Sequence, residues 1–313
     1  MTATMRAAIY HLAGDIRVEE RPLPGDPAAG ELLVRIRVCG MCGSDVTTWY
    51  MDPRAPTVLG HEPAGDIVAV GAGVTDFKVG DRVALHHHVP CMVCDLCQHG
   101  NYTLCPTFRR TRLIPAGMAE YVRIPAEIVA RDTLLIPADM SYEIAAMTEP
   151  IACCVRALDR SNIHMGDTVV VIGGGFNGVT MALLASHWGA DKVALLEKLP
   201  ARITRAVDLG LKVFNPDDQN FRDQLNAWTD GSGPHAVICT VSAHPAMDMA
   251  LDLCGPGATL MMYAPSAPAK CIRWMLSKYS STKLRSQAPT PPARLTRAVP
   301  CLCSIMVSST PTS

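Results

Sequence analysis

The sequence has almost no net charge, and its first residues do not show the pattern of a secretory signal. Its 28 lysines and arginines stand against 29 aspartates and glutamates, which gives a formal net charge of −1. A chain balanced in this way has no electrostatic footprint for nucleic acid or for an anionic membrane. No basic segment followed by a short apolar run opens the chain, so we expect a cytoplasmic protein without a secretory signal.

The sequence also lacks an apolar run that would indicate a membrane span. Its most apolar stretch, TVVVIGGGFNGVTMALLA at residues 168–185, contains three central glycines and Asn177. These residues and the modest length indicate a buried strand, a turn and a helix instead. With 313 residues, of which 49% are apolar, the chain fits a globular protein of two domains.

The first half of the sequence is rich in strand patterns. In LLVRIRVCG, residues 32–40, valine and isoleucine alternate with arginine, as in a half-buried strand. In GHEPAGDIVAVGAGV we expect turns at Gly60 and Gly65 and a strand at DIVAVG, and DRVALH follows as another strand. After Met140, MSYEIAAMTEPIACCVRALDR is typical of a helix, which we expect Pro150 to break.

The second half alternates β-type apolar runs with helical patterns. This rhythm predicts right-handed βαβ units and a parallel sheet, with the boundary between the halves near residues 150–165. The runs are Val169–Ile172, Lys192–Leu196, Val213–Phe214, Ala236–Val241 and Ala258–Tyr263. Past Lys278 the periodic pattern ends, and Pro289, Pro291 and Pro292 exclude a regular helix. We therefore expect a weakly ordered tail, with the last part of the sheet missing.

Cysteine is abundant, with 13 residues. Disulfide frameworks are usual in short secreted chains, so this long chain favours metal binding. Four cysteines have the spacing C-x2-C-x2-C-x7-C, and four thiolates can surround a structural Zn²⁺ tetrahedrally. They are Cys91, Cys94, Cys97 and Cys105. The alternative, four scattered buried cysteines, is disfavoured because chance rarely places four ligands within 15 residues.

A glycine-rich turn follows the first apolar run of the second half. VVVIGGGFNG places Gly173, Gly175 and Gly178 as G-x-G-x-x-G, between a strand and an apolar helix. In that context the glycines permit a tight turn, let the backbone approach a pyrophosphate, and let the helix pack on the strand. Phe176 and Asn177 open the helix, so we expect them at the cofactor as well. A glycine-rich turn in a flavodoxin-like sheet is the alternative.

An acidic residue ends the next apolar run. Glu197 closes KVALLE, 19 residues after Gly178. A carboxylate there accepts hydrogen bonds from the ribose 2′-OH of NAD and repels the 2′-phosphate of NADP. Lys198 and Arg202 follow closely and weaken this preference, and Arg202 is itself expected at the cofactor. The sequence therefore favours NAD over NADP.

Two further groups of donors remain. The histidines His86–His88 could line a pocket or bind metal adventitiously, but a solvated loop end is the favoured interpretation. The second group mixes sulfur, nitrogen and oxygen donors, as a catalytic zinc with three protein ligands requires. Its members are Cys42, His61, Glu62 and Glu149. Cys39 is the local alternative to Cys42, although a buried thiol is its commoner role.

In combination, the motifs resemble those of zinc-dependent medium-chain alcohol and polyol dehydrogenases. CGSD, GHEPAGDIVAVG, GDRVA, the Cys91–Cys105 segment, EPIACCVRAL and VVVIGGGFNG follow the order of that family over about residues 5–265. The resemblance implies a GroES-like, β-rich catalytic domain at residues 1–155, a Rossmann NAD-binding domain at 156–278 and an irregular tail at 279–313. It also implies two zinc ions per chain and a homo-oligomer, which the atypical tail puts in question.

The resemblance also implies roles for single residues. Cys42 and His61 would bind a catalytic zinc, with Glu62 and Glu149 sharing the remaining position. Ser44 would relay the proton of the substrate hydroxyl, and a helix N-cap is its structural alternative. Asp45 would support the zinc site through hydrogen bonds. The hydride would pass to a nicotinamide ring.

The glutamate in TEP resembles the sorbitol and threonine dehydrogenase branch, which implies a polyol or secondary alcohol as substrate and NAD⁺ as oxidant. One alternative is a zinc-free quinone or enoyl reductase on the same fold, which the cysteine spacing and GHE oppose. The other is a zinc-binding family member without catalysis, which the atypical tail favours.

Overall fold

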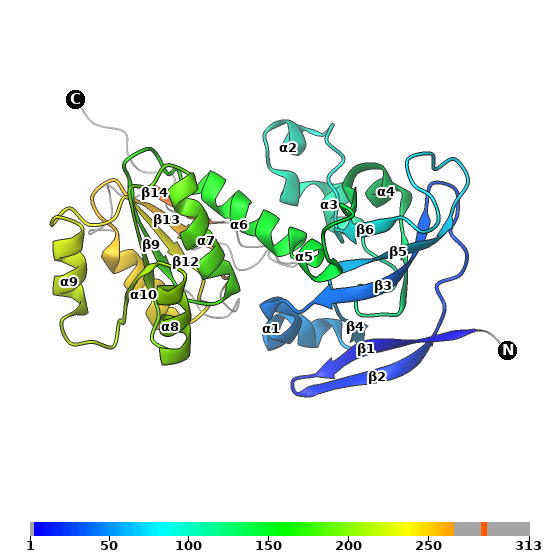
Figure 1. Ribbon diagram of the computed structural model, residues 1–313, viewed down its shortest axis with the longest axis horizontal. Coiled ribbons are helices and arrows are strands. Elements are labelled where there is room, and N and C mark those ends of the chain that lie inside the picture. The colour runs from blue at the N-terminus through cyan, green and yellow to red at the C-terminus, as the bar shows by residue number, and fades with distance from the viewer. Residues whose placement is uncertain (1–2, 266–282, 287–313) are drawn as a thin grey trace, which may run out of the picture.

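Three β-sheets organise the fold of the protein. The computed structural model describes residues 3–265 and 283–286. Within these residues the first half of the chain forms a three-stranded and a five-stranded sheet, and the second half forms a six-stranded sheet. Figure 1 shows the two halves side by side, joined by helix α6 (Thr148–Arg160). Along the described part of the chain, no helix is long and apolar enough to cross a membrane.

The first half is a β-rich body of antiparallel strands. The strand order is β2-β1-β4 in one sheet and β7-β3-β5-β6-β8 in the other. The strands are β1 Thr4–Leu12, β2 Asp15–Pro22, β3 Leu32–Gly40, β4 Thr57–Val58, β5 Glu62–Val70, β6 Arg82–Leu85, β7 Tyr121–Ile124 and β8 Thr133–Leu135. The short helices are η1 Gly43–Val46, α1 Thr48–Met51, η2 Asp52–Arg54, α2 Asp95–Gln98, η3 Tyr102–Leu104, α3 Pro106–Arg110, α4 Ala126–Asp132 and α5 Tyr142–Ala146.

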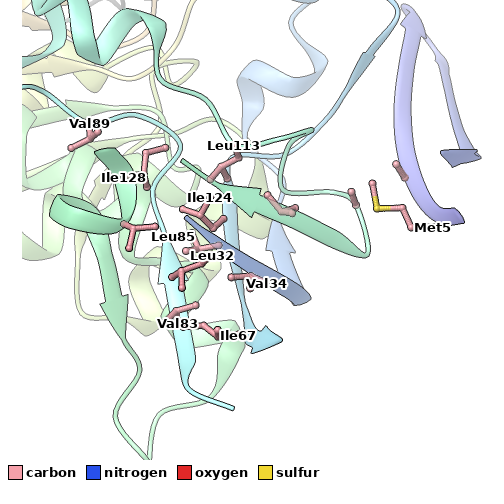
Figure 2. Packing of buried hydrophobic residues seen from close by; sticks show 14 residues of the cluster. Met5, Leu32, Val34, Ile67, Val83, Leu85, Val89, Leu113, Ile124 and Ile128 are labelled. Atoms are coloured by element: carbon pink, nitrogen blue, oxygen red, sulfur yellow. The ribbon is translucent and has the colours of Figure 1, made fainter. Parts of the chain in front are cut away.

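Apolar side chains of the five-stranded sheet form the core of this body. Val34 on β3 is fully buried and Ile36 is half-buried, while Arg35 between them is exposed, so the predicted alternation is confirmed; Leu32 is fully buried as well. Figure 2 shows Leu32 and Val34 packed near Val83 of β6 and Ile124 of β7. This packing fixes the positions of β3 and β5. Cys42 follows the end of β3, His61 directly precedes β5, and Glu62 is the first residue of β5.

The second half is a parallel sheet covered by helices. Its strand order is β11-β10-β9-β12-β13-β14, and neighbouring strands pair in parallel. The strands are β9 Thr168–Ile172, β10 Lys192–Leu196, β11 Lys212–Phe214, β12 Ala236–Cys239, β13 Thr259–Met262 and β14 Lys283–Ser286. The helices are α7 Phe176–His187, α8 Pro200–Asp208, α9 Phe221–Trp228 and α10 His244–Leu253. The predicted parallel sheet of a Rossmann fold is therefore confirmed.

The sheet extends further than the sequence indicated. We expected its last part to be missing, but β14 pairs with β13 from Thr259↔Lys283 to Met262↔Ser286. Four residues with a single apolar side chain, Leu284, are too short a pattern to stand out among serine, arginine and proline. The rest of the predicted tail lies outside the described residues.

Two boundaries in the middle of the chain also differ from expectation. The helix break falls at Met147, between α5 and α6, and Pro150 lies in the first turn of α6. Proline is tolerated there because the first N–H groups of a helix have no intrahelical partner. Strand β5 begins at Glu62, so Gly65 lies within the strand, where a Cβ atom would meet the Arg35 carbonyl oxygen at 2.2 Å.

The substitution Leu158→Ala tests how α6 is anchored on the six-stranded sheet. Leu158 is fully buried in a cluster with Val171 and Met181, so the truncation leaves a cavity. We expect the free energy of unfolding to fall by about 2–5 kcal/mol, measured by urea denaturation. Val155→Ala, at an exposed position of the same helix, should stay within about 0.5 kcal/mol of the parent. Similar losses for the two variants would contradict this packing.

Candidate active site

One buried carboxylate orients two of the predicted metal ligands. Asp45 lies in η1, which begins directly after Cys42, at the end of β3. Its Oδ2 accepts a hydrogen bond from the Cys42 backbone N–H at 3.0 Å, and its Oδ1 lies 3.3 Å from Nδ1 of His61. The ligand atoms of Cys42, His61 and Glu62, here called the Cys42 centre, all lie within 4.8 Å of one another. Thiolate, imidazole and carboxylate are the donor types that a catalytic zinc takes.

The carboxylate of Glu62 reaches the Cys42 centre because a glycine stands opposite it. Glu62 pairs with Gly40 of β3, and a Cβ atom at Gly40 would lie 2.0 Å from Glu62 Oε2. The side chain is buried, and burial raises the pKa of Glu62, to which the charge of Glu149 adds while His61 opposes it. A nearby cation would stabilise the ionised form of a carboxylate that is buried in this way.

The charges at the Cys42 centre favour a bound cation. Burial would lower the pKa of His61, but Asp45, Cys42 and Glu149 raise it to about 11. Burial would likewise raise the pKa of the Cys42 thiol, but His61 and the Ser44 hydroxyl lower it. The neighbouring carboxylates therefore favour a proton on His61, and His61 together with the Ser44 hydroxyl favours the thiolate of Cys42, which is the form that binds metal.

The other two predicted residues of this site lie close by. Ser44 is half-buried in η1, and its hydrogen bond to Cys42 lowers the pKa of that thiol. The N-cap of η1 is Cys42, so the alternative role of Ser44 as an N-cap is wrong. Glu149, at the start of α6, lies within 4.8 Å of ligand atoms of His86 and His87, and it accepts a hydrogen bond from the Cys153 thiol.

The histidine run is not a solvated loop end. His86, His87 and His88 are all half-buried directly after β6. The ring centroids of His61 and His87 lie 5.0 Å apart, so the run reaches the Cys42 centre. Three adjacent histidines are visible as a run in the sequence, but no local pattern shows that they lie beside His61, which is far from them along the chain.

The four spaced cysteines form a compact cluster in the cysteine lobe, residues 91–105. The ligand atoms of Cys91, Cys94, Cys97 and Cys105 lie within 4.8 Å of one another. Burial would raise the pKa of Cys105, but backbone N–H groups, first that of Cys91, lower it to about 6. Four thiols that lie close enough together to share one ion, with N–H groups that stabilise the thiolate form of Cys105, fit a structural zinc ion.

Two arginines of α6 hold the cysteine lobe. Nη2 of Arg156 and Nη2 of Arg160 donate to the Gly100 carbonyl oxygen at 3.1 Å and 2.9 Å. Nη2 of Arg160 also donates to Oδ1 of Asn101 at 3.3 Å. The lobe is thereby attached to the helix that carries Glu149.

A cleft of about 1010 Å³ connects the glycine-rich turn with the Cys42 centre. From the six-stranded sheet it is lined by every residue that the sequence assigned to the cofactor: Gly173, Gly175, Phe176, Asn177, Gly178, Glu197 and Arg202. From the β-rich body, Cys42 and Glu62 line it. Gly175 is the N-cap of α7, so the free N–H groups of that helix start at the cleft, where they suit an anion.

Glu197 has a structural role that the sequence did not reveal. Its carboxylate is buried and accepts hydrogen bonds from the backbone N–H groups of Gly174, Lys198 and Leu199, at 2.7, 2.7 and 2.9 Å. Burial would raise the pKa of Glu197, but these donors and Arg202, 3.6 Å away, lower it. The ionised carboxylate therefore shapes the glycine-rich turn that it borders.

Two alanine substitutions compare a glycine of this turn that is closely packed with one that has open space around it. A Cβ atom at Gly178 would lie 1.8 Å from the Gly173 carbonyl oxygen, whereas one at Gly175 would meet nothing within 4 Å. We expect Gly178→Ala to lower the melting temperature by several degrees, since the helix must move off the strand. Gly175→Ala should leave it nearly unchanged. Thermal unfolding by circular dichroism measures both, and a tolerated Gly178→Ala would contradict the close approach.

The sequence matches two family models. The model of the alcohol dehydrogenase GroES-like domain matches residues 28–137, and the model of the zinc-binding dehydrogenase matches residues 178–285. Sorbitol dehydrogenase of Bacillus subtilis (strain 168) is 32% identical over 257 residues, which cover 79% of this chain and 71% of the relative. D-arabitol-phosphate dehydrogenase of Enterococcus avium is 36% identical over 231 residues, 71% of this chain and 64% of the relative.

Solved structures agree with these matches. Alcohol dehydrogenase TADH from Thermus sp. ATN1 superposes with a TM-score of 0.75 at 27% identity, covering 90% of this chain and 84% of that chain. A zinc-binding dehydrogenase from Sinorhizobium meliloti 1021, bound to NADP, gives a TM-score of 0.77 at 26% identity, covering 91% and 84%. Matching motifs, fold and relatives lead to one conclusion: the chain belongs to the zinc-dependent medium-chain polyol dehydrogenase family.

Proposed function

We propose that this protein oxidises a polyol or secondary alcohol by transferring a hydride to NAD⁺, with a zinc ion at the Cys42 centre. The observation that carries the proposal is the single cleft in which Cys42 and Glu62 face the glycine-rich turn. Metal donors and the anion-binding start of α7 thereby border one space, which a cofactor and a small alcohol can share.

Each group of residues has a separate task in this reaction. Cys42, His61 and Glu62 would hold the catalytic zinc, with Glu149 able to exchange with Glu62. When bound, Zn²⁺ supplies a Lewis acid that makes a substrate hydroxyl more acidic. Asp45 keeps Cys42 and His61 in place through its two carboxylate oxygens.

Proton transfer falls to Ser44. Its hydroxyl lies next to Cys42 and can accept the proton of a substrate hydroxyl while it passes its own proton on to solvent. NAD⁺ supplies the hydride acceptor. On the cofactor side, the turn Gly173–Gly178 and the start of α7 would hold the pyrophosphate, and Glu197 would receive the ribose hydroxyl.

The substrate class follows from the oxygen donors at the site. Glu62 and Glu149 make the surroundings of the metal polar, which suits a substrate with neighbouring hydroxyl groups. Relatives named sorbitol dehydrogenase and D-arabitol-phosphate dehydrogenase support a polyol. A zinc-free reductase of the same fold would have no use for the cysteine cluster or the Cys42 centre. A non-catalytic family member would show no turnover with polyols, threonine or butanediol and NAD⁺.

Metal analysis of cysteine variants tests the two proposed zinc sites. We expect about two zinc ions per chain as purified, and about one in Cys42→Ser, which should lose turnover yet keep its fold. Cys97→Ser should lose the other ion and unfold at lower temperature, because the ion would no longer join the two ends of the cysteine lobe. Cys254→Ser, at the end of α10, is the control; its thiol donates to the Ala250 carbonyl oxygen at 3.3 Å. Near-normal activity of Cys42→Ser would refute the ligand assignment.

Glu197→Ser tests the choice of cofactor. Loss of hydrogen bonds to a charged acceptor, about 1.5–3 kcal/mol each, should weaken NAD⁺ about tenfold or more. Removal of the carboxylate also frees Arg202 to pair with a 2′-phosphate. The ratio of kcat/KM with NADP⁺ to kcat/KM with NAD⁺ should therefore rise. Asp217→Ser, which removes another carboxylate of the cleft, should leave the ratio nearly unchanged.

The melting temperature of Glu197→Ser must be measured alongside, because the variant also loses three backbone hydrogen bonds. A parent protein that prefers NADP⁺, or an unchanged cofactor ratio in a folded Glu197→Ser protein, would show that Lys198 and Arg202 set the preference instead.

A further inference from the structure

A second group of metal-binding side chains lies beside the Cys42 centre. His86, His87 and Glu149, here called the His87 cluster, each offer a ligand atom, and these atoms lie within 4.8 Å of one another. The two histidines follow β6 and the glutamate opens α6, so elements far apart in sequence bring them together. Two imidazoles and one carboxylate form a donor set that suits zinc and related divalent ions.

His86 is held in the tautomer that a metal needs. Its Nδ1 lies 2.6 Å from Oδ2 of Asp132, the last residue of α4. An ionised carboxylate can accept hydrogen bonds but cannot donate them. In the neutral imidazole, Nδ1 therefore carries the proton and Nε2 keeps its lone pair. Carboxylates orient metal-binding histidines in this way. Asp45 has the same relation to His61 in the Cys42 centre.

His87 carries a buried nitrogen without a partner. Its Nδ1 is inaccessible and has no hydrogen-bond partner in the described part of the protein. An unpartnered polar atom in such a place calls for a ligand.

The surrounding charge exceeds what one metal ion can balance. Cys42, Glu62 and Glu149 are joined by the orienting carboxylates of Asp45 and Asp132, and each is negative when deprotonated. One divalent ion and the guanidinium of Arg112, whose Nη1 lies 2.9 Å from Nδ1 of His88, together balance three of these five charges. A second cation would meet a region that is still negative, which reduces the repulsion between two nearby ions.

We propose that the His87 cluster is a second binding position for a divalent metal ion such as Zn²⁺, next to the Cys42 centre. This position is additional to the proposed catalytic and structural zinc sites. Because it contains no thiolate, it should bind more weakly than the cysteine-containing sites and fill only when free zinc is raised. An ion there would hold Glu149 and hinder its exchange with Glu62.

The test counts metal ions rather than turnover, so it stands apart from the proposed reaction. The full protein is dialysed against zinc buffers of increasing free concentration, and bound zinc per chain is measured by elemental analysis. We expect binding to rise from about two ions to about three. His87→Gln should lose the third ion and keep the others, and Asp132→Asn should weaken it by about 10–100-fold. His187→Gln, an exposed histidine on α7, should bind like the parent.

Cobalt(II) gives an independent identification. When the protein is titrated with Co²⁺, the third equivalent should add ligand-field absorption. It should not add the thiolate charge-transfer band that marks cysteine-containing sites. Circular dichroism checks the fold of each variant, and Asp132→Asn decides the outcome if His87→Gln does not fold. Failure to bind a third ion at millimolar free zinc would overturn the proposal. Full retention of that ion in folded His87→Gln or Asp132→Asn would overturn it too, since the ion would then lie elsewhere.

Discussion

Helix α6 is the constraint on which the arrangement of the molecule depends, because three parts of the structure meet on it. Leu158 is buried in the core of the six-stranded sheet, and Arg156 and Arg160 donate to the Gly100 carbonyl oxygen of the cysteine lobe. At its first turn, Glu149 lies beside His86 and His87. One element thus sets the position of the Glu149 carboxylate relative to both halves, and its packing matters for the candidate site as much as for stability.

The candidate donor groups carry negative charge, and further carboxylates lie behind their histidines. Asp45 and Asp132 do not belong to the donor groups, yet each lies at Nδ1 of a histidine that does. The same carboxylates fix the tautomers and raise the attraction for a cation. Burial makes this arrangement unfavourable unless protons or metal ions compensate, and the raised pKa of His61 is the protein's response when a proton is the compensating cation.

The sequence predicted what depends on local pattern and missed what depends on contact. β3, β9 and β10 were predicted closely because period-2 alternation and buried apolar runs are local signals. The gathering of Cys91–Cys105 followed from spacing alone. By contrast, the backbone bonds of Glu197 and the nearness of His87 to His61 arise only when distant strands meet, and β14 is too short to carry a pattern.

Each wall of the cleft rests on a core of its own. Leu32, Val34 and Ile67 stabilise the strands that end or begin near the Cys42 centre, whereas Val171 and Leu195 stabilise those that lead to the glycine-rich turn and Glu197. Changes at the metal donors therefore need not disturb the turn, and changes at the turn need not disturb the donors. The two walls depend on each other through α6, so a loss of its packing would alter the distance between the Cys42 centre and the glycine-rich turn before it removed either of them.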